Sequence, residues 1–192
     1  MRWSSTVPGD PMNSQQKISH AAHSPLTCHL HETRSHLPVA GHIVAGLGSG
    51  APSSNALTFA TDFAAKQGAA LHIVHCIDVE DMPVETDSPY YEDRFHQAVT
   101  AQRDRALAIL HAFPGNWTYD CQRAEPAQYL MTIADTYGAF VIVIGAPRLG
   151  AVSAGGTLFH TSVSSRLARQ NRYALLLIPA TVSAAAWPDK ST

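Results

Sequence analysis

A parallel α/β domain spanning residues 39–180 is the fold that this sequence predicts. Short apolar segments alternate with segments in which apolar residues recur at helical spacing, and most of these segments end at glycine or proline. This alternation predicts βαβ units with right-handed crossovers, and helices on both faces of the sheet. Residues 1–38 and 181–192 lack such a pattern, and we expect a disordered N-terminal tail and a short C-terminal tail.

Five segments have the length and apolar content of strands. They are predicted near residues 42–47, 70–77, 117–122, 140–145 and 174–178. The third segment, Trp117 to Cys121, is the most polar, which indicates a position at an edge of the sheet. The last, Ala174 to Ile178, is strongly apolar, carries no charge and ends at Pro179.

Four helices are predicted between these strands. The first contains Ala56, Leu57 and Ala60 and ends at Gly68, and the second runs from about Phe95 to Phe113 before Pro114. The third contains Leu130 and Ile133 and ends at Gly138, and the fourth turns Val163 and Leu167 inward.

Composition narrows the class of protein. Hydrophobic residues make up 45% of the 192 residues and charged residues 15%, which is ordinary for a globular protein. A net charge of −2 predicts no nucleic-acid partner, and no apolar run approaches the ~18 residues of a membrane helix. Three scattered cysteines and the absence of a secretory signal favour the cytoplasm. The start of translation, Met1 or Met12, stays open.

A glycine-rich loop after the fourth strand is the candidate binding site. Ligands of open α/β sheets bind beyond the carboxyl ends of the strands. The loop begins with Gly145 and Gly150 and ends in Thr161-Ser162 next to a helix start, where backbone N–H groups can hold a phosphate. The alternative interpretation is a plain connection with an ordinary Ser/Thr cap.

Several segments, in order, resemble the universal stress proteins. They are Ile43 to Ser49, Leu71 to Asp78, Glu125 to Ala127, Val141 to Gly145, and Thr161-Ser162-Val163 running on to Pro179. The resemblance implies a five-stranded parallel sheet in the order 3-2-1-4-5 and a role in stress adaptation. It also implies a homodimer through the last strand, Ala174 to Ile178, and an unknown protein partner. The rival interpretation is that Ala180 to Trp187 covers this edge instead.

Some members of that family bind ATP and others do not. The binders have G-x2-G-x9-G-[ST] in the last loop and an Asp at the end of the first strand. Here the loop reads Gly145-x4-Gly150-x10-Thr161-Ser162, and Leu47 takes the place of the Asp. The resemblance implies a degenerate site, with ATP as the candidate cofactor. The residues that it would contain are Gly145, Gly150, Thr161, Ser162, Val163, Leu47 and Cys76.

Other polar residues give no catalytic set, so we expect no enzyme activity. The histidines of the N-terminal tail, with Cys28, lack the scaffold that four metal ligands need. His72 and His75 are three apart on one strand, so they face opposite sides and cannot chelate one ion together. The sequence therefore predicts a dimeric regulatory or interaction protein. The alternative is an ATP-binding stress sensor with slow hydrolysis.

Overall fold

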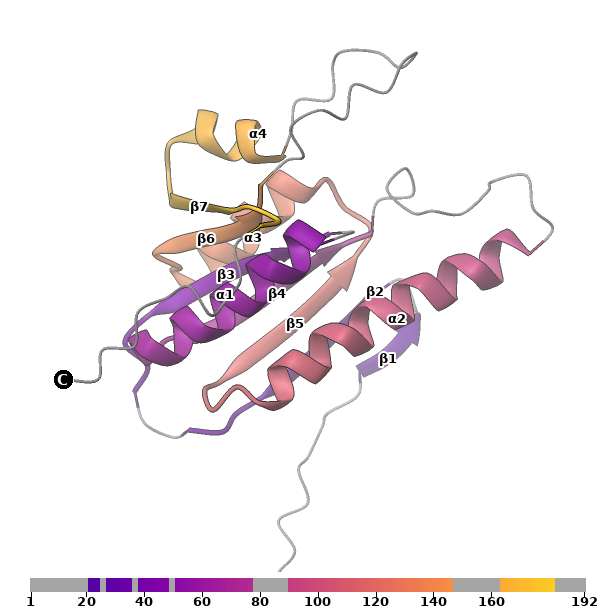
Figure 1. Ribbon diagram of the computed structural model, residues 1–192, viewed down its shortest axis with the longest axis horizontal. Coiled ribbons are helices and arrows are strands. Elements are labelled where there is room, and N and C mark those ends of the chain that lie inside the picture. The colour runs from indigo at the N-terminus through magenta and orange to yellow at the C-terminus, as the bar shows by residue number, and fades with distance from the viewer. Residues whose placement is uncertain are drawn as a thin grey trace, which may run out of the picture.

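One sheet of seven strands organises the molecule (Figure 1), in the order β1-β2-β5-β4-β3-β6-β7. The computed structural model describes residues 21–24, 27–35, 38–48, 51–77, 90–146 and 163–181. The strands are β1 (Ala21–Ser24), β2 (Thr27–Glu32), β3 (His42–Leu47), β4 (Ala70–Cys76), β5 (Trp117–Gln122), β6 (Val141–Gly145) and β7 (Ala174–Ile178). The helices are α1 (Ala51–Gln67), α2 (Tyr91–His111), α3 (Pro126–Tyr137) and α4 (Val163–Gln170).

The five predicted strands form the parallel part of this sheet. Their order, β5-β4-β3-β6-β7, is the predicted 3-2-1-4-5, and each neighbouring pair is parallel. The α/β fold with a mainly parallel sheet flanked by helices is therefore confirmed. The central strands have apolar residues on both faces because both faces are covered.

Helices cover the two faces and enclose two cores. In Figure 1, α1 and α2 lie on one face and α3 lies behind the sheet. The first core joins α1 and α2 to alternate residues of β3, β4 and β5. The second core joins α3 and α4 to the other side of β3, β4 and β6. His75 contacts Tyr119 in the first core, whereas His72 stacks on Tyr137 of α3 on the other side of the sheet. The prediction that the two histidines face opposite sides is therefore confirmed.

The N-terminal region departs from prediction. Residues 1–38 were predicted to be disordered and outside the domain, but β1 and β2 form an antiparallel hairpin, and β2 pairs along all of β5. Leu30 is only 8% exposed and belongs to the first core. For residues 21–24 and 27–32 the prediction is wrong, because an edge strand offers free N–H and C=O groups along its whole length and a partly polar segment can pair with them.

The same hairpin changes the position of β5. Its polar composition indicated a sheet edge, and that is wrong for the complete sheet, because β2 covers it. The Asn116 side chain makes three hydrogen bonds, of 2.8 to 3.0 Å, to the backbone of Arg34 and Ser35, which follow β2 in the chain. At the opposite edge of the sheet, β7 pairs only with β6 among the described residues. Within the described ranges, no helix is long and apolar enough to span a membrane.

Candidate functional site

The carboxyl ends of β3 and β6 lie side by side, and the predicted site surrounds them. β3 ends at Leu47 and is followed by Gly48, and the neighbouring β6 ends at Gly145. Two adjacent strands whose connections leave in different directions form a switch point, where open α/β sheets bind ligands. Of the predicted site residues, Leu47, Cys76, Gly145 and Val163 are described. The other three, Gly150, Thr161 and Ser162, lie outside the described residues.

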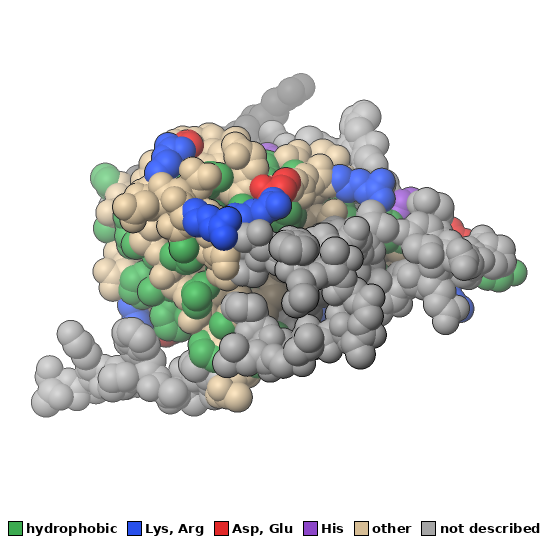
Figure 2. All heavy atoms as spheres, turned by 90° about the horizontal axis from the view of Figure 1, so that it is seen from above, with side chains coloured by type: hydrophobic (Ala, Val, Ile, Leu, Met, Phe, Trp, Pro, Cys, Tyr) green, Lys and Arg blue, Asp and Glu red, His purple; other side chains and the backbone are tan. Residues whose placement is uncertain are grey.

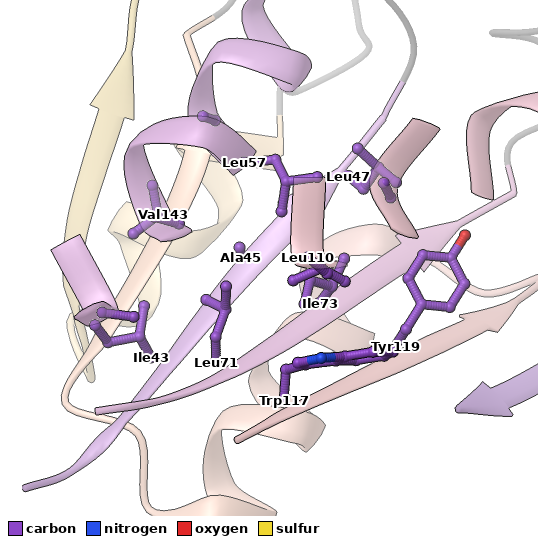
Figure 3. Packing of buried hydrophobic residues seen from close by; sticks show 14 of the residues in the cluster. Ile43, Ala45, Leu47, Leu57, Leu71, Ile73, Leu110, Trp117, Tyr119 and Val143 are labelled. Atoms are coloured by element: carbon purple, nitrogen blue, oxygen red, sulfur yellow. The ribbon is translucent and has the colours of Figure 1, made fainter. Parts of the chain in front are cut away.

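Leu47 is part of the first core. Its side chain is 6% exposed and lies on the same face of the sheet as Leu57, Ile73 and Leu110 (Figure 3). Side chains alternate along a strand, so Ala45 and Leu47 both point under α1 and α2. The end of β3 therefore presents a hydrocarbon side chain to the helices and provides no hydrogen-bond acceptor beyond its backbone.

The backbone after β3 is hydrogen-bonded within the chain. The amide of Gly48 donates to the hydroxyl of Ser53 at 2.7 Å, and the Gln102 side-chain amide donates to the carbonyl oxygen of Gly48. Both side chains are nearly buried, at 6% and 9% exposure. The amide and carbonyl of Gly48 are thus used by α1 and α2, so a ligand would have to compete with these bonds.

Sequence reasoning missed both of these residues, although each carried a signal. Ser53 lies in the first turn of α1, where a hydroxyl commonly satisfies a free backbone amide. Gln102 lies between Val99 and Ala106 at helical spacing, so it occupies a core-facing position of α2. A polar residue on such a face needs a partner. Only the tertiary structure identifies that partner as the loop after β3.

Gly145 allows α1 to pack closely against the end of β6. A Cβ atom at this position would lie 2.7 Å from the carbonyl carbon of Pro52, 2.8 Å from its oxygen and 2.9 Å from the nitrogen of Ser53. These are backbone atoms at the start of a helix and cannot rotate away. The glycine is therefore required by packing, whatever the loop beyond it binds.

Cys76 and Val163 lie on the other face. Cys76 ends β4 and Val163 begins α4, and both are partly buried and pack against the second core. The described site residues are thus divided between the two faces of the sheet: Leu47 belongs to one core and this pair to the other.

The N-terminus of α3 already holds an anion. Glu125 precedes α3, and its carboxylate accepts hydrogen bonds from the amides of Ala127 and Gln128 at 3.1 and 2.8 Å. It also pairs with Arg166 of α4 at 2.8 Å. Burial by itself raises the pKa of Glu125, but the two amides and Arg166 outweigh it and hold this pKa below its usual value. The positive end of α3 is thereby occupied by the chain's own carboxylate.

A buried polar group lies under α2. The hydroxyl of Tyr119 is hydrogen-bonded to Nδ1 of His75 at 2.6 Å, and Sγ of Cys121 lies 3.7 Å from the same nitrogen. Burial lowers the pKa of His75 to about 4, although a hydrogen bond with Gln102 acts in the opposite direction. Burial raises the pKa of Tyr119 well above its usual value. The imidazole is therefore neutral at pH 7 and closed off from solvent.

A row of connected polar side chains crosses the opposite face of the sheet. Nδ1 of His42 lies 2.9 Å from Nε2 of His72, whose Nδ1 lies 2.9 Å from the Thr118 hydroxyl. That hydroxyl donates to one oxygen of Asp120 at 3.3 Å, and Nδ1 of His29 reaches the other at 2.5 Å. Burial, with smaller contributions from His42 and His29, lowers the pKa of His72 to about 3. This row of side chains connects four strands, β2, β5, β4 and β3. No cluster of three or more potential metal ligands occurs in the described parts of the protein.

Comparison with known proteins identifies the fold. A sequence model of the Universal stress protein family matches residues 40–179. A universal stress family protein from Burkholderia pseudomallei is 26% identical, with a TM-score of 0.53 over 73% of this chain and 96% of that one. A universal stress protein solved in complex with cAMP is 22% identical, with a TM-score of 0.50 over 75% and 100%.

A third structure, UspA from Lactobacillus plantarum, is 14% identical with a TM-score of 0.49 over 74% of this chain and 99% of that one. No curated protein matches this chain. The matched stretch, residues 40–179, runs from β3 to β7 and leaves out the N-terminal hairpin. On this match, which covers well over half of its length, the chain belongs to the universal stress protein family.

Proposed function

We propose that this chain is a cytoplasmic stress-adaptation protein that acts through contacts with other proteins and binds ATP weakly or not at all. The observation that carries the proposal is Leu47, which fills with a buried hydrocarbon side chain the place where ATP-binding relatives have a carboxylate. A hydrogen bond to a charged group contributes about 1.5–3 kcal/mol. Its absence weakens binding by about ten- to a hundredfold.

The neighbouring backbone supports the same conclusion. The amide and carbonyl of Gly48 are hydrogen-bonded within the chain, and the backbone at the start of α1 occupies the space next to Gly145. Binding that used these groups would first require α1 or α2 to release them, which costs further free energy.

The protein contact that we propose first is with a second copy through β7. This strand has an outer edge that pairs with no described strand, and Leu177 is 44% exposed. Figure 2 shows hydrophobic side chains reaching the surface on the side of the molecule where α4 and β7 lie. On the other side of the parallel sheet β2 covers β5, so a second copy could pair directly with β5 only if the hairpin left. Pairing of β7 with itself about a two-fold axis would satisfy the free backbone groups of both copies.

A second candidate function, nucleotide sensing, is favoured by one of the comparisons. A universal stress protein of the same fold was solved in complex with cAMP. A nucleotide on this chain would meet Cys76 and Val163 from the second core and Leu47 from the first.

The two functions are separated by isothermal titration calorimetry with ATP and with cAMP, together with sedimentation of the same sample. We expect a dimer at micromolar concentration and dissociation constants above 100 µM, roughly what remains when a micromolar site loses a hundredfold. Leu177→Lys should give a monomer, because an edge charge opposes strand pairing, whereas Tyr90→Lys, at a 65% exposed residue before α2, should remain dimeric. Submicromolar binding of either nucleotide would establish the sensor instead.

A further inference from the structure

Two cysteines face each other across the pair of strands that holds the N-terminal hairpin on the domain. Cys28 of β2 and Cys121 of β5 are direct partners in the antiparallel register. Both side chains lie on the face of the first core, where Leu30 and Tyr119 form the next pair on the same side. Both residues are thiols here, not a disulfide.

The backbone geometry suits a covalent bond between them. Directly opposed residues of antiparallel strands have Cα atoms about 4.5 or 5.5 Å apart, depending on the type of pair. Disulfides span Cα separations of about 4.4–6.8 Å, so either type of pair fits without moving the strands apart. The two thiols also share a hydrogen bond.

The two thiols differ in reactivity. Cys28 is partly exposed, whereas Cys121 is 2% exposed. The hydrogen bond with Cys121 is the largest influence on the pKa of Cys28 and lowers it, while the same bond, together with burial, raises the pKa of Cys121. The thiolate is the reactive form, so Cys28 is the thiol that meets an oxidant first and Cys121 is placed behind it to resolve the product.

We propose that Cys28 and Cys121 form a reversible disulfide that locks the N-terminal hairpin onto the edge of the parallel sheet when a small-molecule disulfide such as glutathione disulfide accumulates. The thiolate of Cys28 attacks one sulfur of glutathione disulfide, which breaks its S–S bond and releases one glutathione thiolate. The sulfur of Cys121 then attacks Sγ of Cys28 and displaces the second glutathione. The two cysteine protons end on the two released glutathione molecules, so one disulfide is reduced as the protein disulfide forms.

The bond would add a covalent link where the pairing of β2 with β5 and the packing of Leu30 hold the hairpin in the reduced state. In the reduced state β2 lies near one edge of the sheet, and a strand there separates from its neighbour by local unfolding more easily than a central strand does. After oxidation, Cys28 cannot leave Cys121, so β2 stays paired and β5 stays covered. Oxidation also removes the thiol hydrogen of Cys121 next to His75, in the group that includes Gln102.

The control for this chemistry is the third cysteine. Cys76 lies on the other face of the sheet, packed against the second core, so it is placed away from the opposed pair. Cys76→Ser keeps both partners and should oxidise as the wild type does. Cys28→Ser removes the reactive partner at a partly exposed position and is therefore milder than Cys121→Ser, which would change a buried residue.

The experiment incubates the full-length protein with glutathione redox buffers, blocks the remaining thiols by alkylation and maps the peptides by mass spectrometry. We expect a cross-linked peptide containing Cys28 and Cys121 in the wild type and in Cys76→Ser, reversed by dithiothreitol and absent from Cys28→Ser. Hydrogen exchange of residues 27–32 should slow at least tenfold on oxidation. A stable glutathione adduct on Cys28, a link from Cys121 to Cys76, or unchanged exchange in the cross-linked protein would overturn the proposal.

Discussion

Gly145→Ala tests whether the glycine at the end of β6 serves packing. The added Cβ would lie 2.7–2.9 Å from backbone atoms of Pro52 and Ser53, whereas ordinary contacts begin at 3.4 Å. The start of α1 must therefore move by several tenths of an ångström. If Gly145 mattered only for the approach of a phosphate, the substitution would leave the folded protein unchanged.

The size of the effect follows from two opposing contributions. Crowding of this kind in a packed interior costs about 1–3 kcal/mol. Replacing glycine by alanine also restricts the unfolded chain, which stabilises by about 0.4–1 kcal/mol. We therefore expect a net loss of about 1–2 kcal/mol, which lowers the melting temperature of a protein of this size by about 2–8 °C.

Gly48→Ala is the matched control. Gly48 lies at the same edge of the sheet, and a Cβ there would meet no heavy atom within 4 Å. Its stability should equal that of the wild type or exceed it by up to about 1 kcal/mol. Urea denaturation followed by circular dichroism measures all three proteins. Equal midpoints for Gly145→Ala and Gly48→Ala would refute the packing argument.

Three further predictions concern stability. Glu125→Ala should cost about 0.5–2 kcal/mol above pH 4.5, because the α3 amides lose their acceptor, and urea titrations should show this cost shrinking as the pH falls and the wild-type carboxyl takes up a proton. His72 and His75 have folded pKa values of about 3 and about 4, below the usual 6.5, so stability should fall as the pH drops below 6.5, by about 1.4 kcal/mol per pH unit for each histidine. His75→Gln should flatten this dependence, and an unchanged slope between pH 7 and 5 would contradict it. Asn116→Ala should accelerate hydrogen exchange at residues 34–35 and leave β6 as it is, because three hydrogen bonds to that segment are lost.

The parallel part of the fold could be predicted from sequence because its signals are local. The strands β3, β5 and β7 occupy the predicted residues, and β4 and β6 differ by one residue at one end. Gly68 and Gly138 end their helices with φ of 64°, a conformation that glycine adopts without strain. Each of these features depends on residues within a few positions of one another.

The N-terminal hairpin could not be predicted in this way. β2 carries polar residues at alternate positions, and only Cys28 and Leu30 face the core. Such a segment forms a strand because the edge of β5 is available to it, about 90 residues later in the chain. The polar character of β5 did indicate incomplete burial, but its interpretation as a free edge overlooked that another segment could cover it.

At the candidate site, the residues at the ends of β3 and β6 could be predicted from the sequence, because strand ends follow from local pattern. It also identified Leu47 as the departure from the ATP-binding pattern. The contacts of these residues could not be predicted: Leu47 is buried, Gly48 is hydrogen-bonded to Ser53 and Gln102, and Gly145 packs against α1. Burial and hydrogen bonding depend on side chains that folding brings together from distant parts of the chain, and no local pattern encodes which partner arrives.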